Sequence, residues 1–282
     1  MPQIKVSDCT YVYQPGTITA KTAVEHIDLC VEQGEMIAVI GKGGSGKSTL
    51  SLLLAGLYEP SSGLVSVMGE TAPAGKVFRQ VGLVFQYPEQ QLFSATVYDE
   101  VAFGARNFGA AEEDSPAIVS SALAEVGLDP QTYKGRDPFA LSGGQKRRLC
   151  LACLLAIDPA VVILDEPTAG LDPAGREWVK RLIKRLHERG KTVIWVSHDM
   201  TEVAETAERV IVLNAGHLIM DGTPEQVFAD EDKLTEAGLA LPAAAKLLRR
   251  LKAEGIDVAA RSVTAEAAYE EILSVLGGPF HV

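Results

Sequence analysis

The chain has 282 residues, of which 47% are hydrophobic and 22% are charged. This length suffices for one large domain or two modest ones with a buried core, and the composition excludes collagen-like, coiled-coil and disordered chains. The 37 acidic residues outnumber the 26 Lys and Arg residues, which gives a net charge of -11. That charge argues against a broad nucleic-acid-binding surface, so no nucleic-acid partner is expected. A local phosphate site stays compatible with it, because backbone N–H groups can bind phosphate without basic side chains.

The sequence predicts neither a membrane span nor a secretory signal. The longest apolar run, Leu149–Ile157, has nine residues, whereas a membrane-spanning helix needs about 18. The N-terminus lacks the apolar core of a signal peptide, so we expect the chain to stay in the cytoplasm. Cys150 and Cys153 form a C-x-x-C pair within an apolar helical pattern. With no second pair and no nearby His, a structural role is favoured over a metal or redox site.

Strand and helix patterns alternate over about the first 220 residues, which is typical of an α/β domain built on a largely parallel sheet. Short apolar runs rich in β-branched residues predict strands buried on both faces at Met36–Ile40, Val161–Leu164 and Thr192–Val196. The runs Arg209–Leu213 and His217–Met220 flank an Asn-Ala-Gly turn and predict a β-hairpin.

The segment after the first of these strands matches the phosphate-loop motif G-x-x-x-x-G-K-S, and a helical pattern over Ser48–Leu57 follows it. Glycines let successive N–H groups converge on phosphate oxygens, and the helix N-terminus adds positive potential. We expect Lys47 to reach the β- and γ-phosphates of a nucleotide and the Ser48 hydroxyl to bind Mg²⁺. A glycine-rich turn before a chance Lys-Ser is the alternative. The expected nucleotide-binding residues here are Gly41, Lys42, Gly43, Gly44, Ser45, Gly46, Lys47, Ser48 and Thr49.

Two adjacent carboxylates, Asp165 and Glu166, end the predicted strand at 161–164. We expect Asp165 to hold the Mg²⁺ shell, directly or through water, and Glu166 to orient the attacking water or accept its proton. Without a phosphate loop upstream, the pair would be read as a simple strand end before Pro167.

The segment Leu141-Ser142-Gly143-Gly144-Gln145 precedes another helical pattern and has two interpretations. Ser142 and Gln145 have the spacing of a capping box, which predicts an ordinary capped helix. Ser142, two glycine amides and the helix dipole also form a second candidate anion site. One nucleotide per chain hardly needs both sites, but a dimer in which one chain closes the other's nucleotide site uses both.

In this order, the phosphate loop, the 141–145 signature and Asp165-Glu166 resemble the ATP-binding-cassette (ABC) ATPases over about Ile4–Phe228. The resemblance implies an α/β fold of the P-loop NTPase type, with a RecA-like core, an antiparallel β subdomain and a helical signature subdomain. It implies that the cofactors are ATP and Mg²⁺. By the same resemblance, Gln86 is a catalytic sensor that also contacts the metal, and His198 contacts the γ-phosphate.

Two more assignments rest on the resemblance. Asp172 lies across the dimer seam, and Tyr13 stacks on adenine. Each has an alternative, because Asp172 before Pro173 is also a good helix cap. His198 fits a plain strand-to-helix turn. Tyr13 fits a surface aromatic in an edge strand, with Tyr11 on the same strand face.

A narrower resemblance, to the ATPases of energy-coupling-factor importers, covers residues 85–93 and 99–104. Features at Asn107-Phe108-Gly109 and at Leu239-Ala240-Leu241-Pro242 agree with it, and Tyr13-Gln14-Pro15-Gly16-Thr17 suggests the second of two paralogous A components. It implies ATP-driven uptake of a vitamin or transition metal. The implied partners are a second ATPase chain, identical or paralogous, a transmembrane T-type subunit and a substrate-binding S-type subunit. The chain would then lie at the cytoplasmic face of the cell membrane as a peripheral subunit.

We therefore expect an ATP-binding domain over 1–224 and a helical dimerisation appendage over 225–282, where Ala244, Leu247, Leu248 and Leu251 have helical spacing. One or both of Leu92 and Phe93 are expected to line a groove for a helix of the transmembrane partner, with core burial as the alternative. Another transporter class, or a soluble ABC protein acting in translation or on DNA, is the alternative function. The single cassette, the short spacing between the motifs and the acidic charge disfavour the soluble proteins.

Overall fold

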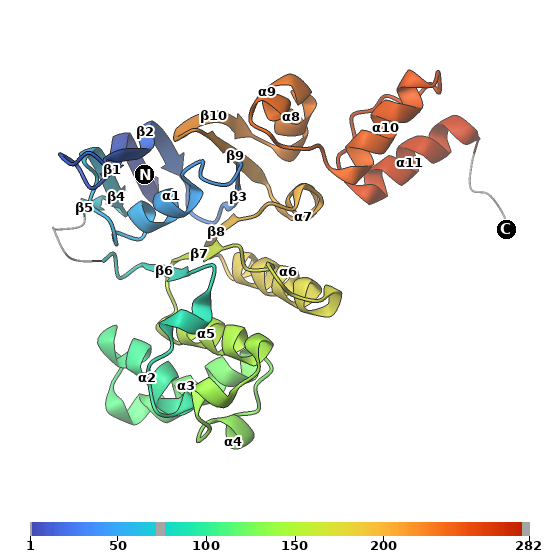
Figure 1. Ribbon diagram of the computed structural model, residues 1–282. Helices are drawn as coiled ribbons and strands as arrows, with labels where there is room; N and C mark the ends of the chain where they lie inside the picture. Colours follow the sequence, from blue (N-terminus) through green and yellow to red (C-terminus); the bar gives the residue numbers. More distant parts are fainter. Residues whose placement is uncertain (1, 72–76, 278–282) are drawn as a thin grey trace.

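A computed structural model describes residues 2–71 and 77–277, which form two sheets, a group of helices below them and a helix pair at the C-terminal end (Figure 1). The main sheet has the strand order β10-β9-β3-β8-β7-β6. Neighbouring strands are parallel except for the β9–β10 hairpin. The strands are β3 (Met36–Ile40), β6 (Val81–Val84), β7 (Val161–Asp165), β8 (Thr192–Val196), β9 (Arg209–Asn214) and β10 (His217–Gly222).

The three predicted double-sided strands and the predicted hairpin are confirmed. Every residue of β3, β7 and β8 is buried, because both faces of the sheet are covered. Alternate residues belong to different hydrophobic clusters, as the two-residue period of a strand requires. In β3, Ile37 and Val39 join one cluster, and Met36, Ala38 and Ile40 join the other.

A second, antiparallel sheet has the order β2-β1-β4-β5. Its strands are β1 (Ile4–Tyr13), β2 (Lys21–Val31), β4 (Ser62–Val67) and β5 (Glu70–Thr71). Apolar residues of this sheet and of helix α1 (Lys47–Leu54) share a cluster with Ile37, Val39 and Ile163 of the main sheet. The phosphate-loop helix is therefore enclosed between the two sheets.

Helix α1 ends at Leu54, before the predicted end at Leu57. Gly56 takes a left-handed conformation with φ 72°. Its N–H donates to the Leu53 carbonyl, and the Leu57 N–H donates to the Leu52 carbonyl. Hydrophobic spacing continues past this point, but the glycine closes the helix with the bonds of a Schellman-type end.

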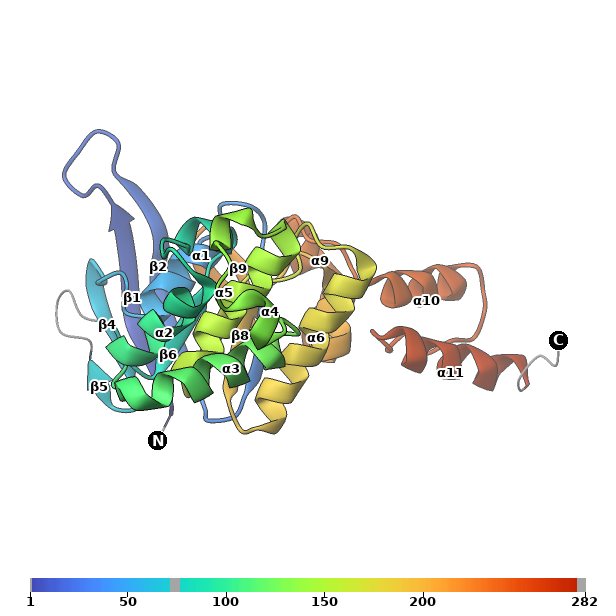
Figure 2. The same ribbon diagram turned by 90° about the horizontal axis from the view of Figure 1, so that it is seen from below.

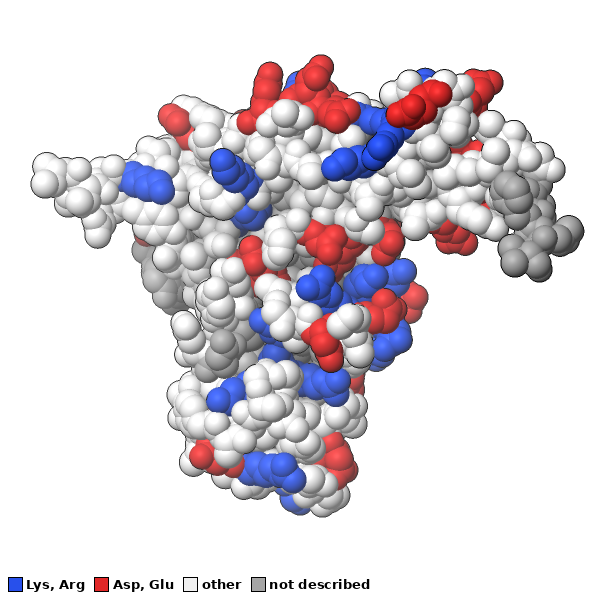
Figure 3. Space-filling model, turned by 45° about the vertical axis from the view of Figure 1, so that its right-hand side comes forward, with Lys and Arg blue, Asp and Glu red and all other residues white. Residues whose placement is uncertain are grey.

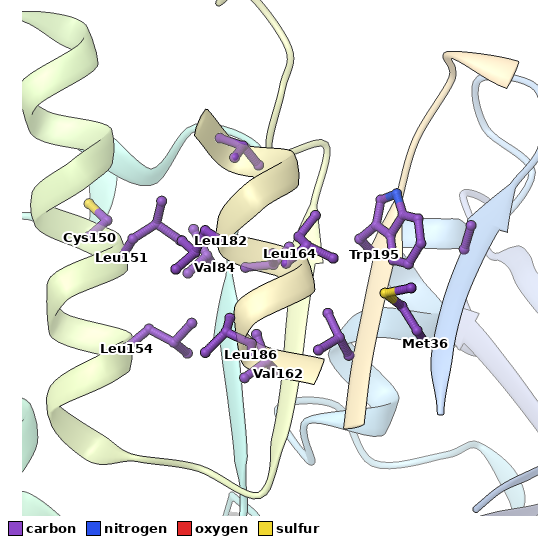
Figure 4. Close-up of a cluster of buried hydrophobic side chains, with 14 of the residues drawn as sticks. Met36, Val84, Cys150, Leu151, Leu154, Val162, Leu164, Leu182, Leu186 and Trp195 are labelled. Carbon is purple, nitrogen blue, oxygen red and sulfur yellow. The ribbon is translucent and has the colours of Figure 1, made fainter. Parts of the chain in front are cut away.

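The helical subdomain lies below the main sheet in Figure 1. Its helices are α2 (Val97–Asn107), α3 (Ser115–Glu125), α4 (Pro130–Tyr133) and α5 (Gly143–Ile157), with short 3₁₀ turns at Pro88–Gln91, Glu112–Asp114 and Pro138–Ala140. Leu151 and Leu154 of α5 point toward Val84 and Leu182, so this subdomain and the sheet share one apolar cluster (Figure 4). Cys150 is buried and Cys153 is half-buried on the same helix.

Two further helices carry the chain between sheet strands. They are α6 (Pro173–Glu188) and α7 (Met200–Thr206). Helix α6 buries Val179, Leu182, Ile183 and Leu186, which have the helical spacing of one face. Leu186 faces Val162 of β7, and Trp195 of β8 closes the far end of the same cluster (Figure 4).

The C-terminal region contains α8 (Pro224–Ala229), α9 (Glu231–Glu236), α10 (Ala243–Ala253) and α11 (Ala265–Leu276). Phe228 and Leu234 belong to the main cluster, so α8 and α9 pack on the ATP-binding part. Helices α10 and α11 project to one side (Figure 2) around a small cluster of their own: Ala244, Leu248, Val258 and Ala268. The division at 224 and 225 stays a proposal, with the projecting pair beginning at Ala243.

Leu247 does not lie on the buried face of α10, contrary to the predicted face of Ala244, Leu247, Leu248 and Leu251. It is 49% exposed, because α11 packs on the side of α10 that carries Ala244 and Leu248. Tyr269 of α11 is also exposed. The helix pair therefore presents apolar side chains to solvent.

Two surface properties bear on function. Within residues 2–71 and 77–277, no helix is long and apolar enough to span a membrane. On the face shown in Figure 3, acidic and basic side chains are interspersed and no continuous basic face is visible.

Candidate functional site

A pocket of about 380 Å³ lies at the phosphate loop, between the two sheets. It opens at the carboxyl end of β3, which is where ligands bind in parallel α/β sheets. It is lined by Tyr13, Lys21, Ala23, Gly43, Gly44, Gly46, Lys47, Ser48, Thr49, Gln86 and Glu166. Six of the nine expected loop residues, the expected aromatic and the expected catalytic carboxylate thus share one cavity, whereas Gly41, Lys42 and Ser45 do not line it.

At two positions of the loop only glycine fits, because the backbone of another segment passes close to its Cα atom. A Cβ on Gly41 would lie 2.3 Å from the Leu213 carbonyl oxygen, and a Cβ on Gly46 would lie 2.5 Å from that of Ala23. Gly43 and Gly44 differ, since a Cβ on either meets nothing within 4 Å. These two residues therefore present bare backbone toward open space, as a phosphate cradle requires.

Polar groups at the base of the loop are also suited to binding phosphate. The Lys47 ammonium donates to the carbonyl oxygens of Gly41 at 2.8 Å and Lys42 at 3.1 Å. Burial lowers the pKa of Lys47, while the nearby Glu166 and Asp165 carboxylates raise it. The Ser45 hydroxyl oxygen is buried without a hydrogen-bond partner among the described residues. Phosphate oxygens in the pocket would accept from the Lys47 ammonium, because Lys47 lines it.

The residues expected to hold Mg²⁺ fit that ion. Asp165 ends β7 and is only 5% exposed. Burial raises the pKa of its carboxyl, and a hydrogen bond with the Ser48 side chain opposes that rise. Mg²⁺ is commonly held by one or two carboxylates together with substrate phosphates, and here a hydroxyl and a carboxylate lie beside the cradle. Gln86 adds an amide side chain at the same pocket.

Gln86, Glu166 and His198 converge from the ends of three adjacent parallel strands, β6, β7 and β8. The Gln86 side-chain amide donates to Glu166 Oε2 at 2.8 Å. The same oxygen lies 3.6 Å from His198 Nδ1. Parallel strands bring their carboxyl ends to one edge of the sheet, which explains how residues so distant in sequence meet.

Glu166 has an unusual backbone conformation. Its φ is 49°, in the left-handed region that residues with a Cβ seldom adopt. Its N–H donates to the Val196 carbonyl at 3.1 Å, which ties it to β8. Such strain costs on the order of 1–3 kcal/mol, and surrounding contacts must maintain it.

The aromatic residues near the pocket form a cluster. Tyr11 stacks on Tyr58 with ring centroids 4.8 Å apart, and the Tyr13 ring stands edge-on to Tyr11 at 5.0 Å. The hydroxyls of Tyr13 and Thr49 are 3.0 Å apart. Of the two candidate aromatics, Tyr13 lines the pocket, whereas Tyr11 packs against the core.

Two pocket residues were not predicted, Lys21 and Ala23 of β2. No motif marks them. They reach the site because β2 pairs with β1, which aligns Lys21 with Tyr13. Only the tertiary arrangement of the antiparallel sheet could have identified them.

The signature segment lies elsewhere, at the exposed start of α5 in the helical subdomain. The predicted capping box is present: Ser142 Oγ accepts from the Gln145 N–H, and the Gln145 side chain accepts from the Ser142 N–H. Gly143 and Gly144 are exposed, and a Cβ on either meets nothing within 4 Å. This second cradle is formed but lies outside the pocket of its own chain.

Asp172 is exposed and caps α6, where its carboxylate accepts from the Gly175 N–H at 2.7 Å. The capping interpretation is thus observed. Its placement at a dimer seam stays a prediction.

A separate groove of about 310 Å³ runs between the main sheet and the helical subdomain, beside Leu92 and Phe93. Phe93 is 60% exposed and its ring meets that of Phe103 edge-on at 4.8 Å. Leu92 also lines the groove, but it is only 6% exposed and belongs to the main cluster, so the core alternative is observed for this residue. Leu92 packs inward because the Glu100 carboxylate accepts from the N–H groups of Phe93 and Ser94, which fixes the turn.

Comparison with known proteins gives consistent matches. A family model described as ABC transporter matches residues 24–169. The energy-coupling factor transporter ATP-binding protein EcfA2 of Clostridium perfringens is 44% identical over 279 residues, covering 97% of this chain and 98% of that protein. The protein of the same name from Symbiobacterium thermophilum is 46% identical over 274 residues, covering 95% of each chain.

Solved structures agree with the sequence matches. The structure of cbiO1 from Clostridium perfringens, described as part of the ABC transporter complex cbiONQ, aligns with a TM-score of 0.71 and 35% identity over 88% of this chain and 99% of that one. A dimeric post-hydrolysis state of the ATP-binding cassette MJ0796, bound to ADP and Pi, aligns with a TM-score of 0.71 and 27% identity. It covers 78% of this chain and 98% of that one.

Proposed function

We infer the function of this chain from its family: it belongs to the ABC transporter family and, within it, to the energy-coupling factor transporter ATP-binding proteins. The fold predicted from the motifs is confirmed by the matching cassettes. The chain is an ATPase subunit that binds ATP and energises an importer of the energy-coupling-factor type.

We propose that two cassettes sandwich two ATP molecules. Each nucleotide would lie between the Gly41–Ser48 loop of one chain and the Ser142–Gln145 cradle of another. The separation of these two cradles within one chain supports this arrangement, because the signature cradle lies outside the phosphate-loop pocket and both cradles have exposed glycine backbone. The dimeric cassette bound to ADP and Pi supports it as a precedent for the fold.

The convergence of Gln86, Glu166 and His198 beside the phosphate loop carries the proposed chemistry. Lys47 would donate to the β- and γ-phosphates, and Glu166 would orient the attacking water and accept its proton. His198 would contact the γ-phosphate and Gln86 would report its presence. Ser48, Asp165 and Gln86 would hold Mg²⁺, which when bound offsets negative charge on the phosphates.

Tyr13 would stack on the adenine ring, since it lines the phosphate-loop pocket. Asp172 would face the second cassette from the start of α6. These two roles complete the proposed set, together with backbone donors at Gly41–Thr49 and Ser142–Gln145.

We propose that the partners are a second ATPase chain, identical or paralogous, a transmembrane T-type subunit and a substrate-binding S-type subunit. The chain would sit as a peripheral subunit at the cytoplasmic face of the membrane and drive uptake of a vitamin or a transition metal. The exposed apolar residues of α10 and α11 support dimerisation through the C-terminal pair. The groove beside Phe93 supports docking of a helix from the membrane subunit.

The test of the hydrolytic assignment is Glu166→Gln. The amide keeps the shape but loses the carboxylate that orients water, so hydrolysis in the assembled complex should fall about 10²–10⁴-fold while ATP binding persists. The variant should also accumulate as an ATP-bound dimer, measured by light scattering with Mg²⁺ and ATP. Glu113→Gln, which changes an exposed carboxylate of the helical subdomain, is the matched control. Near-normal turnover by Glu166→Gln would overturn the assignment.

A further inference from the structure

Arg147 connects three segments that meet at the catalytic carboxylate. It lies on α5, two residues after Gln145 of the signature segment. Its guanidinium donates to the Ala169 carbonyl oxygen at 2.5 Å and to that of Pro167 at 3.2 Å. It also donates to the backbone carbonyl oxygen of Gln86 at 3.4 Å. One side chain of the helical subdomain therefore reaches both the turn that follows Glu166 and the segment that carries Gln86.

These contacts form a closed ring. The Gln86 side chain donates to Glu166, the chain continues from Glu166 to Pro167, and Arg147 binds both Pro167 and the Gln86 backbone. The turn itself is held by the Ala169 N–H, which donates to the Glu166 carbonyl. Arg147 thus binds the backbone of Gln86, the donor of this hydrogen bond, and that of Pro167, which follows its acceptor Glu166.

The turn needs such support, because Glu166 has a φ of 49°. A strained residue keeps its conformation only when its surroundings fix it. On one side the Thr168 hydroxyl donates to the buried Glu202 carboxylate of α7 at 2.9 Å. Arg147 supplies two more contacts, with Pro167 and Ala169, and its helix α5 belongs to a different subdomain (Figure 1).

The geometry of a guanidinium suits this place. Its planar fork presents several donors at fixed angles and stays charged at every accessible pH. A lysine ammonium is a single point charge and cannot bind three carbonyl groups of two separate segments in the same way. The neighbouring Arg148 does something different: it lies over the Trp178 ring at 4.9 Å and donates to the Val126 carbonyl.

We propose that Arg147 is a positioning residue for hydrolysis, which couples the placement of the signature helix to the orientation of Glu166 and Gln86. When α5 is seated against the sheet, the guanidinium holds the Glu166–Ala169 turn in its strained form. When the helical subdomain shifts, the turn loses this contact and the carboxylate loses its fixed direction. The inference rests on the proposed hydrolytic role of Glu166.

The experiment compares Arg147→Ala and Arg147→Lys in the full chain, assembled with its importer partners. Arg106→Ala is the matched control, since Arg106 belongs to the same subdomain but pairs locally with Glu112. For Arg147→Ala we expect kcat for ATP to fall about tenfold to a hundredfold, as for a misplaced catalytic group, with KM changed less than about threefold. Arg147→Lys should recover only a small part of the rate. Arg106→Ala should keep it.

Two further measurements separate positioning from general damage. In a Glu166→Gln background, Arg147→Ala should cause no additional loss of hydrolysis, because Arg147 acts through that carboxylate. Amide hydrogen exchange at Ala169 and Leu171 should become faster in Arg147→Ala and stay unchanged in Arg106→Ala. If Arg147→Ala unfolds, the same criteria are applied to Arg147→Lys.

The outcomes distinguish the two proposals. Wild-type kcat for both Arg147 variants, an equal fold-loss in the Glu166→Gln background, or a loss confined to KM would overturn the role of Arg147. Near-normal turnover by Glu166→Gln alone would instead overturn the hydrolytic assignment of Glu166.

Discussion

Replacing Phe93 by Ser tests whether the groove beside it receives the membrane partner. The ring is 60% exposed at the rim of a groove of about 310 Å³, and Phe103 is its neighbour there. Leu92, the preceding residue, also lines the groove but is buried in the main cluster, and its substitution shows the effect of lost core packing for comparison. Phe93→Ser should strongly weaken partner binding without unfolding the chain. Leu92→Ala should destabilise the fold and leave partner binding by the folded chain largely intact.

The expected magnitudes follow from burial. A fully enclosed Phe buries about 150–250 Å², so the covered two fifths of Phe93 correspond to roughly 1.5–2.5 kcal/mol of stability, at about 25 cal/mol per Å². Leu92→Ala removes a packed core side chain and should cost about 2–5 kcal/mol. Loss of an aromatic anchor from an interface typically costs at least about 2 kcal/mol, which weakens association roughly thirtyfold or more.

Three measurements on each variant separate the effects. Thermal unfolding with and without Mg²⁺ and ATP reports stability and nucleotide binding, and co-purification in mild detergent reports the membrane complex. Phe93→Ser should bind ATP like the wild type and lose the membrane subunit. Leu92→Ala should unfold at a lower temperature, yet its folded fraction should still co-purify. If Phe93→Ser folds, binds ATP and co-purifies at the wild-type level, the groove is not the docking site.

Ser142→Arg should block the signature cradle with a bulky side chain, leave ATP affinity of the isolated chain unchanged, and abolish hydrolysis in the assembled complex. Gly46→Ala should lower stability by about 1–3 kcal/mol and impair ATP binding, because the added Cβ would lie 2.5 Å from the Ala23 carbonyl oxygen. Gly43→Ala is the control and should fold normally, because its Cβ would meet nothing within 4 Å. Leu247→Glu combined with Tyr269→Glu changes side chains that are 49% and 58% exposed, so the chain should fold, bind ATP and fail to dimerise through its C-terminal helices.

Each of these expectations has a result that contradicts it. If the isolated Ser142→Arg chain folds but binds ATP more weakly, the signature segment contacts the nucleotide of its own chain, which contradicts the two-chain arrangement. Equal unfolding temperatures for the Gly46 and Gly43 variants would refute the close-contact argument. If light scattering shows an unchanged dimer mass for the Leu247→Glu, Tyr269→Glu chain, the exposed face of α10 and α11 is not the dimer interface.

The sequence predicted best those functional groups whose residues are close together along the chain. The phosphate loop, the signature and the Asp165-Glu166 pair are short motifs whose spacing is set by one local turn, so their chemistry is visible without the fold. The buried strands β3, β7 and β8 were predicted to within a residue, because continuous β-branched runs have few alternatives. The end of α1 was missed because Gly56 overrides an apolar pattern that continues to Leu57.

Side-chain direction was harder to predict than element type. Leu92 and Phe93 are both apolar and adjacent, and only the turn held by Glu100 decides that one is buried and the other exposed. The choice of Tyr13 over Tyr11 is similar, since Tyr58 comes from a distant loop and stacks on Tyr11. Such outcomes depend on which segments meet, and a local pattern does not contain that information.

The sequence by itself determined the class of chemistry, because binding phosphate and orienting water require particular residue types at fixed local spacing. Tertiary structure alone decided which of these groups lie side by side. Gln86, Glu166 and His198 come from three strand ends and meet only because parallel strands align their carboxyl ends. Lys21 enters the pocket through strand pairing, and Arg147 reaches the turn after Glu166 because α5 packs on the sheet. Contacts between distant segments form when apolar surfaces are buried together. The local sequence around each residue does not show which distant segment it will contact.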